Sequence, residues 1–285
     1  MRNLNRRKIL GGIAVVAIAS QCPNVFAVDP YGPKNAEYTI VVTDPLAMPL
    51  ACSCVEGYAQ RKYEKLADHL QKMLGKSVRV VWSDSIAIAQ REHGLGKKSL
   101  FIGKDSVVRH DTKALNIDVK PLARLTDTNG SVNQRGVFVV RRGNSASTIL
   151  DLEGYKVLWG PDKCDEKSAA PKLRLKEIEV ETTGEEVCET CSIAAVKLVE
   201  ASDSTKVAAV ISSYAEKLLT GCGTVEKGAL RIIGESEEVP FISVFANDEI
   251  TISEAKSLID SLCAIDESKE MLVALESKSG FVAYK

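Results

Sequence analysis

The residues with the most potential chemistry in this sequence are its eight cysteines, which include a Cys52-x-Cys54 pair and a Cys188-x-x-Cys191 pair. Disulfides are the favoured interpretation if the chain works in an oxidising compartment. Thiolates at these spacings also suit a soft metal such as zinc or copper. The Cys188-x-x-Cys191 pair precedes a predicted helix, where a lowered thiol pKa would permit redox chemistry.

All three interpretations stay open at this point. Seven cysteines lie beyond residue 27, and because seven is odd, at least one of them is left outside any disulfide. A metal site would use Cys52, Cys54, Cys188 and Cys191. The disulfide candidates are Cys52, Cys54, Cys164, Cys188, Cys191 and Cys222.

Residues 1–27 decide the compartment, because they have the pattern of a twin-arginine export signal. Arg6 and Arg7 precede a short, mildly apolar core, and Val25-x-Ala27 offers the small residues that a signal peptidase requires. The core is far shorter than the roughly 20 residues that span a bilayer. We therefore expect cleavage near Ala27 and a periplasmic mature protein that does not span the membrane, with lipidation of Cys22 as a lesser alternative.

Composition excludes several classes of function for the mature chain. The net charge is -1, and removal of the four cations in residues 1–27 leaves about -5. With no basic cluster and only 5% aromatic residues, nucleic acid is not an expected partner. Neither an HExxH motif, nor GxSxG, nor a dinucleotide-binding glycine fingerprint occurs, so we expect neither an enzyme nor a cofactor.

Beyond residue 27, short β-branched segments alternate with amphipathic ones, which predicts an α/β fold with helices flanking parallel sheets. The predicted strands are residues 38–43, 78–82, 99–103, 119–125, 136–141, 156–159, 178–180, 207–211, 230–234 and 240–246. The predicted helices are residues 58–74, 85–92, 166–177, 192–200, 213–219, 253–262 and 268–276.

The order of several short motifs resembles the phosphate/phosphonate-type substrate-binding proteins of ABC transporters, which have the type 2 periplasmic binding-protein fold. The opening helix reads YEKLADHLQKMLG and is followed by KSVRVV, and the next matches read LFIG and VKPLAR. Further along, ILDLEGYKV, VAAVISSY and the C-terminal GFV are also similar to segments of that family. The resemblance covers most of the mature chain at low identity.

This resemblance implies two α/β lobes with hinge strands and an interlobe cleft. Lobe 1 would comprise residues 36–135 and 247–285, lobe 2 residues 142–239, and the hinge strands would lie near 136–141 and 240–246. The protein would capture a small polar ligand, an oxyanion among the candidates, for a membrane subunit of an ABC transporter. The implied ligand-binding candidates are Asp44, Lys104, Ser106, Asp165, Lys167, Ser168, Ser192, Ser212, Ser213 and Tyr214.

Two segments depart from the family pattern. The place of a Ser/Thr-rich helix start holds residues 159–168, where Asp165 and Glu166 would favour a helix N-terminus but repel a phosphate. The family's Gly-Ser-His segment is replaced by residues 188–192, which contain no histidine. Phosphonate itself is therefore disfavoured as the ligand. Plain helix capping is the alternative role for the two acidic residues.

Overall fold

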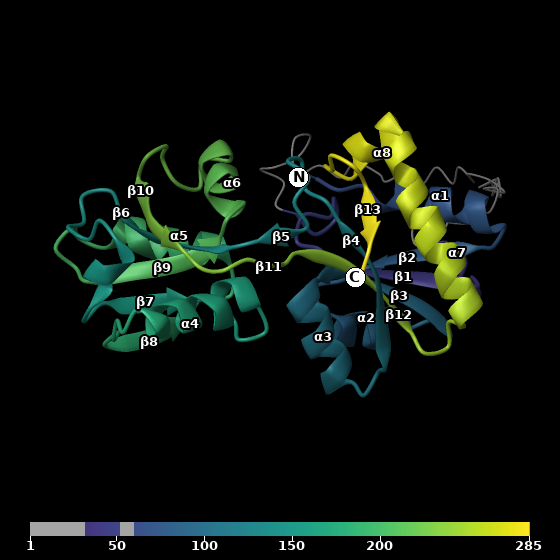
Figure 1. Ribbon diagram of the computed structural model, residues 1–285, viewed down its shortest axis with the longest axis horizontal. Helices are drawn as coiled ribbons and strands as arrows, with labels where there is room; N and C mark the ends of the chain where they lie inside the picture. The colour runs from purple at the N-terminus through teal and green to yellow at the C-terminus, as the bar shows by residue number, and fades with distance from the viewer. Residues whose placement is uncertain (1–31, 52–59, 285) are drawn as a thin grey trace, which may run out of the picture. The chain divides into compact units, whose positions relative to one another are not determined.

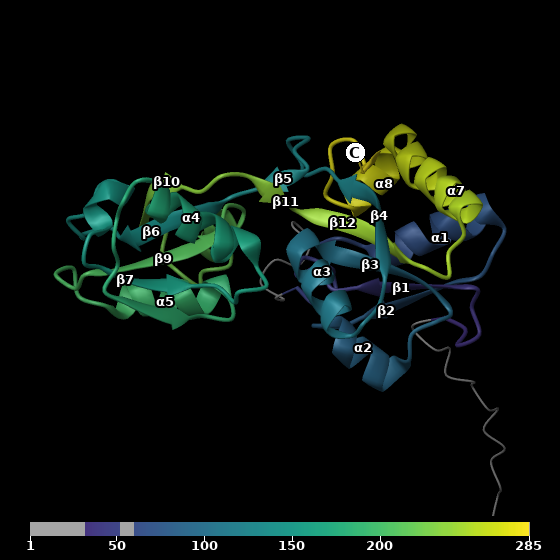
Figure 2. The ribbon, with the colours of Figure 1, turned by 60° about the horizontal axis from the view of Figure 1, so that its bottom comes forward.

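The computed structural model describes residues 32–51 and 60–284, which all belong to one unit of contacts, Tyr31–Lys285. The expected export signal and the Cys22, Cys52 and Cys54 positions lie outside the described residues. Figures 1 and 2 show two separate β-sheets, each flanked by helices. The fold is thus α/β with two lobes, as predicted.

The first sheet has the strand order β13-β4-β12-β3-β1-β2. Strand β1 pairs in parallel with β2 and β3, whereas β12 is antiparallel to both β3 and β4. The bounds are β1 Tyr38–Val42, β2 Val78–Trp82, β3 Lys98–Lys104, β4 Val119–Leu125, β12 Ile242–Asn247 and β13 Phe281–Ala283.

This sheet is buried on both faces, which explains its near-continuous apolar strands. In β1, Ile40 and Val42 belong to one core and Val41 to the core on the other face, because successive side chains in a strand alternate. Helices on one face are α1 Tyr63–Leu74, α7 Ile252–Cys263 and α8 Lys269–Ala274, and those on the other are α2 Ile86–His93 and α3 Asp105–Ala114.

The second sheet has the strand order β10-β6-β9-β7-β8, and its strands also divide between two cores. In β6, Val137 and Val139 face one core, and Phe138 and Val140 face the other. Its strands are β6 Gly136–Arg141, β7 Lys156–Trp159, β8 Gly184–Val187, β9 Val207–Ser212 and β10 Leu230–Glu235. Its helices are α4 Ala169–Glu177, α5 Cys191–Glu200 and α6 Ala215–Gly221, with short 3-10 turns η2 Ile149–Leu152 and η3 Asp165–Lys167.

The chain passes between the two sheets at a short antiparallel pair, β5 (Asn133–Gln134) and β11 (Val239–Pro240). The pair lies between the sheets in Figures 1 and 2. Residues 136–141 and 240–246, where we expected the crossing strands, lie largely within the sheets as β6 and β12. The chain crosses at β5 and β11, which lie beside the N-terminal ends of these two ranges.

Residues 178–180 and helix α3 are two places where the structure differs from the prediction. Residues 178–180 are not a strand, because Glu179 has the left-handed φ of 55° and closes α4, while the strand begins six residues later as β8. Helix α3 was not predicted. Its buried face contains Asp111 and Thr112 beside two valines, so the sequence lacks a clear apolar stripe there.

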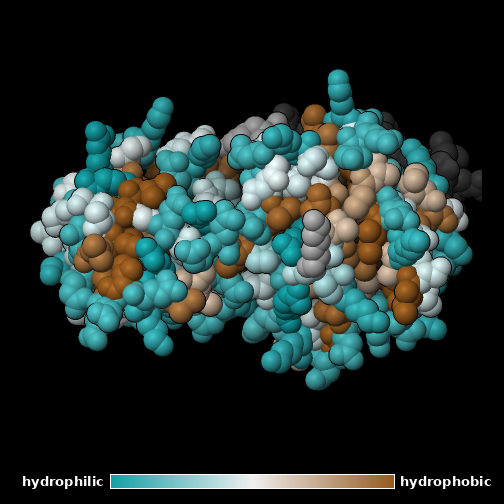
Figure 3. Space-filling model, in the orientation of Figure 1, coloured by the Kyte–Doolittle hydropathy of each residue, from teal (hydrophilic) through white to brown (hydrophobic). Residues whose placement is uncertain are grey.

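The surface is predominantly hydrophilic on the face drawn in Figure 3, with hydrophobic side chains exposed in separate patches. Among the described helices, none combines the length and the apolar character that crossing a bilayer requires.

A buried ion pair anchors the start of α1 to the end of β1. The fully buried Asp44 accepts hydrogen bonds from Arg61 at 2.8 Å and from the Tyr63 hydroxyl at 2.6 Å. Burial opposes the charge on Arg61, but Asp44 outweighs it and raises the guanidinium pKa. The guanidinium also lies 5.1 Å from the ring centre of Phe241. The buried positive charge of Arg61 is therefore compensated by the carboxylate of Asp44.

We predict that Asp44→Ala lowers the free energy of unfolding by about 3–5 kcal/mol, because it leaves the Arg61 charge buried and uncompensated. Urea unfolding followed by circular dichroism measures the loss. Asp260→Ala, on the exposed surface of α7, is the matched control and should leave the midpoint nearly unchanged. Equal midpoints for the two variants would show that the pair does not hold this region together.

Candidate functional site

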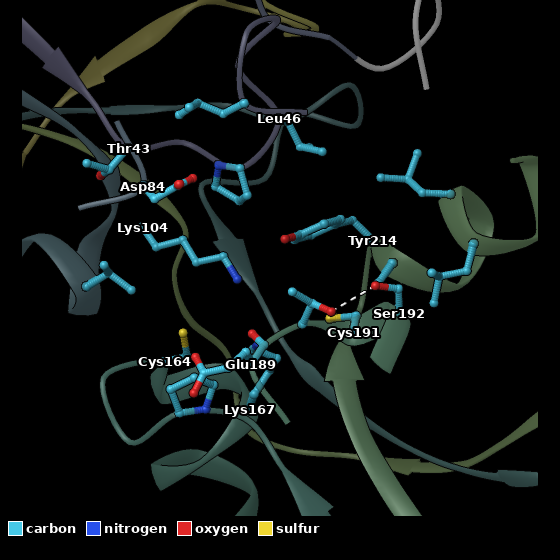
Figure 4. A pocket seen from close by; sticks show the side chains of 18 of the residues that line it. Thr43, Leu46, Asp84, Lys104, Cys164, Lys167, Glu189, Cys191, Ser192 and Tyr214 are labelled. Atoms are coloured by element: carbon cyan, nitrogen blue, oxygen red, sulfur yellow. Dashed lines mark hydrogen bonds between the residues drawn. The ribbon is translucent and has the colours of Figure 1, made fainter. Parts of the chain in front are cut away.

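A cavity of about 760 Å³ lies where strands of both sheets end, as Figure 4 shows. The first sheet contributes Thr43 directly after β1, Asp84 shortly after β2, and Lys104 at the end of β3. Residues that follow β7, β8 and β9 of the second sheet face them. Loops at the carboxyl ends of strands form the usual ligand site of α/β folds. The lining consists of Thr43, Pro45, Leu46, Leu50, Asp84, Lys104, Val107, Pro161, Lys163, Cys164, Lys167, Glu189, Thr190, Cys191, Ser192, Tyr214, Ala215, Leu218, Leu219, Cys222 and Thr224.

A buried ion pair joins the two sheets beside this cavity. Lys104, at the end of β3, is 7% exposed, and Glu166, in η3, is 1% exposed. The Lys104 ammonium donates a hydrogen bond to Oε1 of Glu166, and the Ser212 hydroxyl donates to the same oxygen at 2.9 Å. The second oxygen, Oε2, is buried and has no hydrogen-bond partner among the described residues.

Both members of this pair are charged. Burial alone would lower the pKa of Lys104, but the Glu166 carboxylate outweighs it and raises that pKa well above the ordinary value. Burial alone would raise the pKa of Glu166, but Lys104 outweighs it, and the net shift is downward. The ammonium of Lys104 also lies 5.5 Å from the ring centre of Tyr214. The positive charge at the end of β3 is therefore neutralised within the protein.

Further contacts tie the segment before η3 to α3 of the first sheet. The Ser106 hydroxyl donates to the Lys163 carbonyl at 2.8 Å and accepts from the Asp165 backbone N–H at 3.2 Å. The Lys163 ammonium lies 3.5 Å from a carboxylate oxygen of Asp111. Together with the buried pair, these contacts fix the position of η3 relative to β3 and α3.

A glycine allows the η3 backbone to approach β6 closely enough for this arrangement. A Cβ added at Gly136 would lie 1.9 Å from the carbonyl oxygen of Glu166, a distance that no side chain tolerates. Gly136 also accepts the Ser236 backbone N–H at its carbonyl and donates to the Ser236 hydroxyl. The residue at 136 must therefore be glycine if Glu166 is to reach Lys104.

The structure places the predicted ligand residues at different depths. Lys104, Lys167, Ser192 and Tyr214 line the cavity, and Ser212 lies directly behind it in the ion-pair network. The other predicted residues are not part of the cavity lining. The Asp165 backbone N–H donates to the Ser106 hydroxyl, and the Ser168 hydroxyl donates to Asp162. Ser213 is exposed next to Arg135, and Asp44 belongs to the buried pair with Arg61.

Sequence reasoning missed several lining residues, namely Thr43, Asp84, Lys163, Glu189, Thr190 and the leucines. A usable signal existed for Thr43, Asp84 and Glu189, since each closely follows a strand. Glu166 was interpreted as a helix cap, because its partner Lys104 is 62 positions away in the sequence.

The disulfide prediction is wrong for Cys164, Cys188 and Cys191, which are free thiols, as is Cys263. Cys188 is buried in a core of the second sheet, and the Cys191 sulfur accepts a hydrogen bond from the Ser212 backbone N–H at 3.4 Å. The Cys222 sulfur lies 3.0 Å from the hydroxyl oxygen of Thr224. Cys52 and Cys54 lie outside the described residues.

The metal and redox alternatives receive no support from the described part of the chain. It contains no group of three or more His, Cys, Asp or Glu side chains that could hold a metal ion. Burial raises the pKa of the Cys188 thiol, whereas a reactive pair would require a lowered one. Burial likewise raises the pKa of Cys164.

Several solved structures have a similar fold. XAC2383 from Xanthomonas citri bound to ATP has a TM-score of 0.65 at 11% identity, with 87% of this chain and 92% of that chain covered. PhnD1 from Prochlorococcus marinus in complex with methylphosphonate has a TM-score of 0.62 at 14% identity, with 87% and 93% covered. At these identities the likeness shows the fold alone.

A family model extends the comparison to the sequence. No curated protein matches the chain. The model of the periplasmic substrate-binding protein of phosphonate ABC transporters, in contrast, matches residues 57–285. That match covers more than half of the chain and includes the whole second sheet and every strand of the first sheet except β1. The family consists of non-enzymatic solute-binding proteins of the periplasm, which agrees with the predicted class. The chain therefore belongs to the phosphonate-type periplasmic substrate-binding proteins of ABC transporters.

Proposed function

We propose that this protein captures a small solute in the cavity between its two sheets and delivers it to the membrane subunit of an ABC transporter. The observation that carries the proposal is the composition of the cavity wall, which draws residues from the ends of six strands, three in each sheet. Such a wall supplies hydrogen-bond donors and charges from both sides of a bound molecule. Its volume of about 760 Å³ falls within the usual range for small-molecule sites.

Ligand entry requires the two lobes to separate, and we place the hinge at β5 and β11. With the hinge there, β12 joins residues 36–135 and 247–285 in lobe 1, and β6 joins residues 142–239 in lobe 2, apart from the hinge strands themselves. The short paired strands β5 and β11 carry the chain between the sheets, as hinge segments do in domain closure. Opening would break the Lys104–Glu166 pair and the Ser106 contacts, so the closed form is held by polar interactions across the cleft.

We predict that native mass spectrometry of the periplasmic protein detects a bound small molecule, and that Ser192→Trp abolishes its binding. Ser192 lines the cavity at the start of α5, where an indole would fill the space that the ligand needs. Calorimetric titration with the released molecule measures the affinity of each variant.

Ser257→Trp on the exposed face of α7 is the matched control and should bind as the wild type does. The site assignment would be contradicted if the two tryptophan variants bound the released molecule equally. Absence of any bound or rebinding small molecule would contradict the proposed function itself.

Export to the periplasm is proposed to use residues 1–27 as a cleaved twin-arginine signal. The support is the Arg6-Arg7 pair, the short apolar core and the small residues ending at Ala27. We predict that the intact mass of the periplasmic protein corresponds to a chain starting at Val28, and that replacing both arginines by lysine retains the precursor in the cytoplasm. A mass corresponding to a lipidated chain starting at Cys22 would contradict this processing site.

A further inference from the structure

Lys167 is a buried cation of the cavity wall without an anionic partner. It is 4% exposed, and among the described residues it takes part in no ion pair. Its ammonium donates a long hydrogen bond of 3.4 Å to the carbonyl oxygen of Glu189. By comparison, Lys104 pairs with Glu166 and Lys163 lies near Asp111. A buried charge is costly unless it is paired, so this position calls for an anion.

The position of Lys167 is set by the protein itself. A Cβ added at Gly160 would lie 2.4 Å from Cβ and 2.8 Å from Cε of Lys167, so glycine at 160 lets the lysine stem pass. The backbone N–H of Gly160 donates to the Lys167 carbonyl at 3.0 Å, which fixes the same turn. Figure 4 shows the Lys167 side chain next to Glu189 at the cavity wall. The ammonium is therefore presented as part of a built site.

The start of α5 adds donors at the same part of the wall. This helix has ten residues, its N-cap Thr190 accepts from the Ile193 backbone N–H, and Thr190 and Ser192 both line the cavity. A helix N-terminus favours a negative charge through its unpaired N–H groups. Together with Lys167, it forms a cationic corner of the cavity.

The charges behind this corner limit the ligand to one negative charge. The buried groups Lys104, Lys167 and Glu166 together carry two positive charges and one negative charge, so one further negative charge balances them. A second charge on the ligand would face the buried Glu166 carboxylate, and also the exposed acids Asp84 and Glu189 of the wall.

A further part of the wall is apolar. Leu46 and Leu50 come from the segment after β1, and Leu218 and Leu219 come from α6. A small inorganic oxyanion would leave most of the 760 Å³ cavity and these leucines without contacts. Burial of hydrocarbon against them would instead add to the affinity.

We propose that the ligand is an organic monoanion, a carboxylate with an apolar body, whose carboxylate pairs with Lys167 at the start of α5 while its body packs against the leucines. This assignment rests on the proposed solute-binding function and names the class of solute.

The test is a calorimetric titration of the full mature protein with straight-chain carboxylates from butanoate to dodecanoate, and with octanamide as a neutral isostere. Affinity is expected to rise along the series, and octanamide should bind about tenfold more weakly than octanoate or worse. Lys167→Met should weaken octanoate about tenfold or more and leave octanamide unchanged. Lys172→Met, in α4 and outside the cavity wall, should behave as the wild type.

A second variant tests the proposal even if Lys167→Met does not fold. Leu218→Ser should flatten the dependence on chain length, whereas Leu173→Ser on the exposed side of α4 should not. Equal binding of octanoate and octanamide, or no binding of any carboxylate in the series, would overturn the assignment. A bound native molecule without an acidic group would overturn it as well, while leaving the solute-binding function intact.

Discussion

The ammonium of Lys104 and the carboxylate of Glu166 meet out of water, between the ends of strands that belong to different sheets. Each charge would be unfavourable there without the other, because the surroundings that exclude water also weaken the solvation of both groups. The hydroxyl of Ser212, at the end of β9, completes the arrangement. The relative position of η3 and β3 therefore depends on the two charges remaining together.

This pair also determines what the cavity can hold. A protein carboxylate already neutralises the cation at the end of β3. Among the described residues that line the cavity, the other buried cation is Lys167, which lies toward the start of α5. The cavity thus combines one cationic corner with leucines from α6 and from the segment after β1. Likeness to structures with ATP or methylphosphonate accordingly concerns the fold, and the ligand must be derived from the side chains of this chain.

Local patterns accounted for most of the fold. Strands such as β1 and β6 consist of apolar residues that alternate between two cores, and α1 ends at Gly75, whose left-handed φ of 64° closes the helix. The prediction failed where the pattern was weak, as in α3, whose buried face includes Asp111. It also failed at residues 178–180, where the β-branched Ile178 and Val180 suggested a strand. Glu179 between them has a left-handed φ, which a strand does not allow.

The site was less accessible to sequence reasoning. Residues at or shortly after the ends of strands, such as Lys104 and Tyr214, could be named because carboxyl ends of strands converge in this class of fold. The role of Glu166 could not be named, since it depends on a lysine in the other lobe and on the close approach permitted by Gly136. Cysteine spacing was misleading for a related reason. Cys188 and Cys191 are close in sequence, but one packs into a core and the other contacts Ser212.

The most direct test of this account is the coupling free energy between Lys104 and Glu166, measured by urea unfolding of Lys104→Met, Glu166→Leu and the double variant. Each single substitution is expected to cost about 3–5 kcal/mol by leaving one charge buried and unpaired. The double variant should recover most of that loss, because neither charge remains. Small and additive effects of the two single substitutions would contradict the claim that this pair joins the sheets.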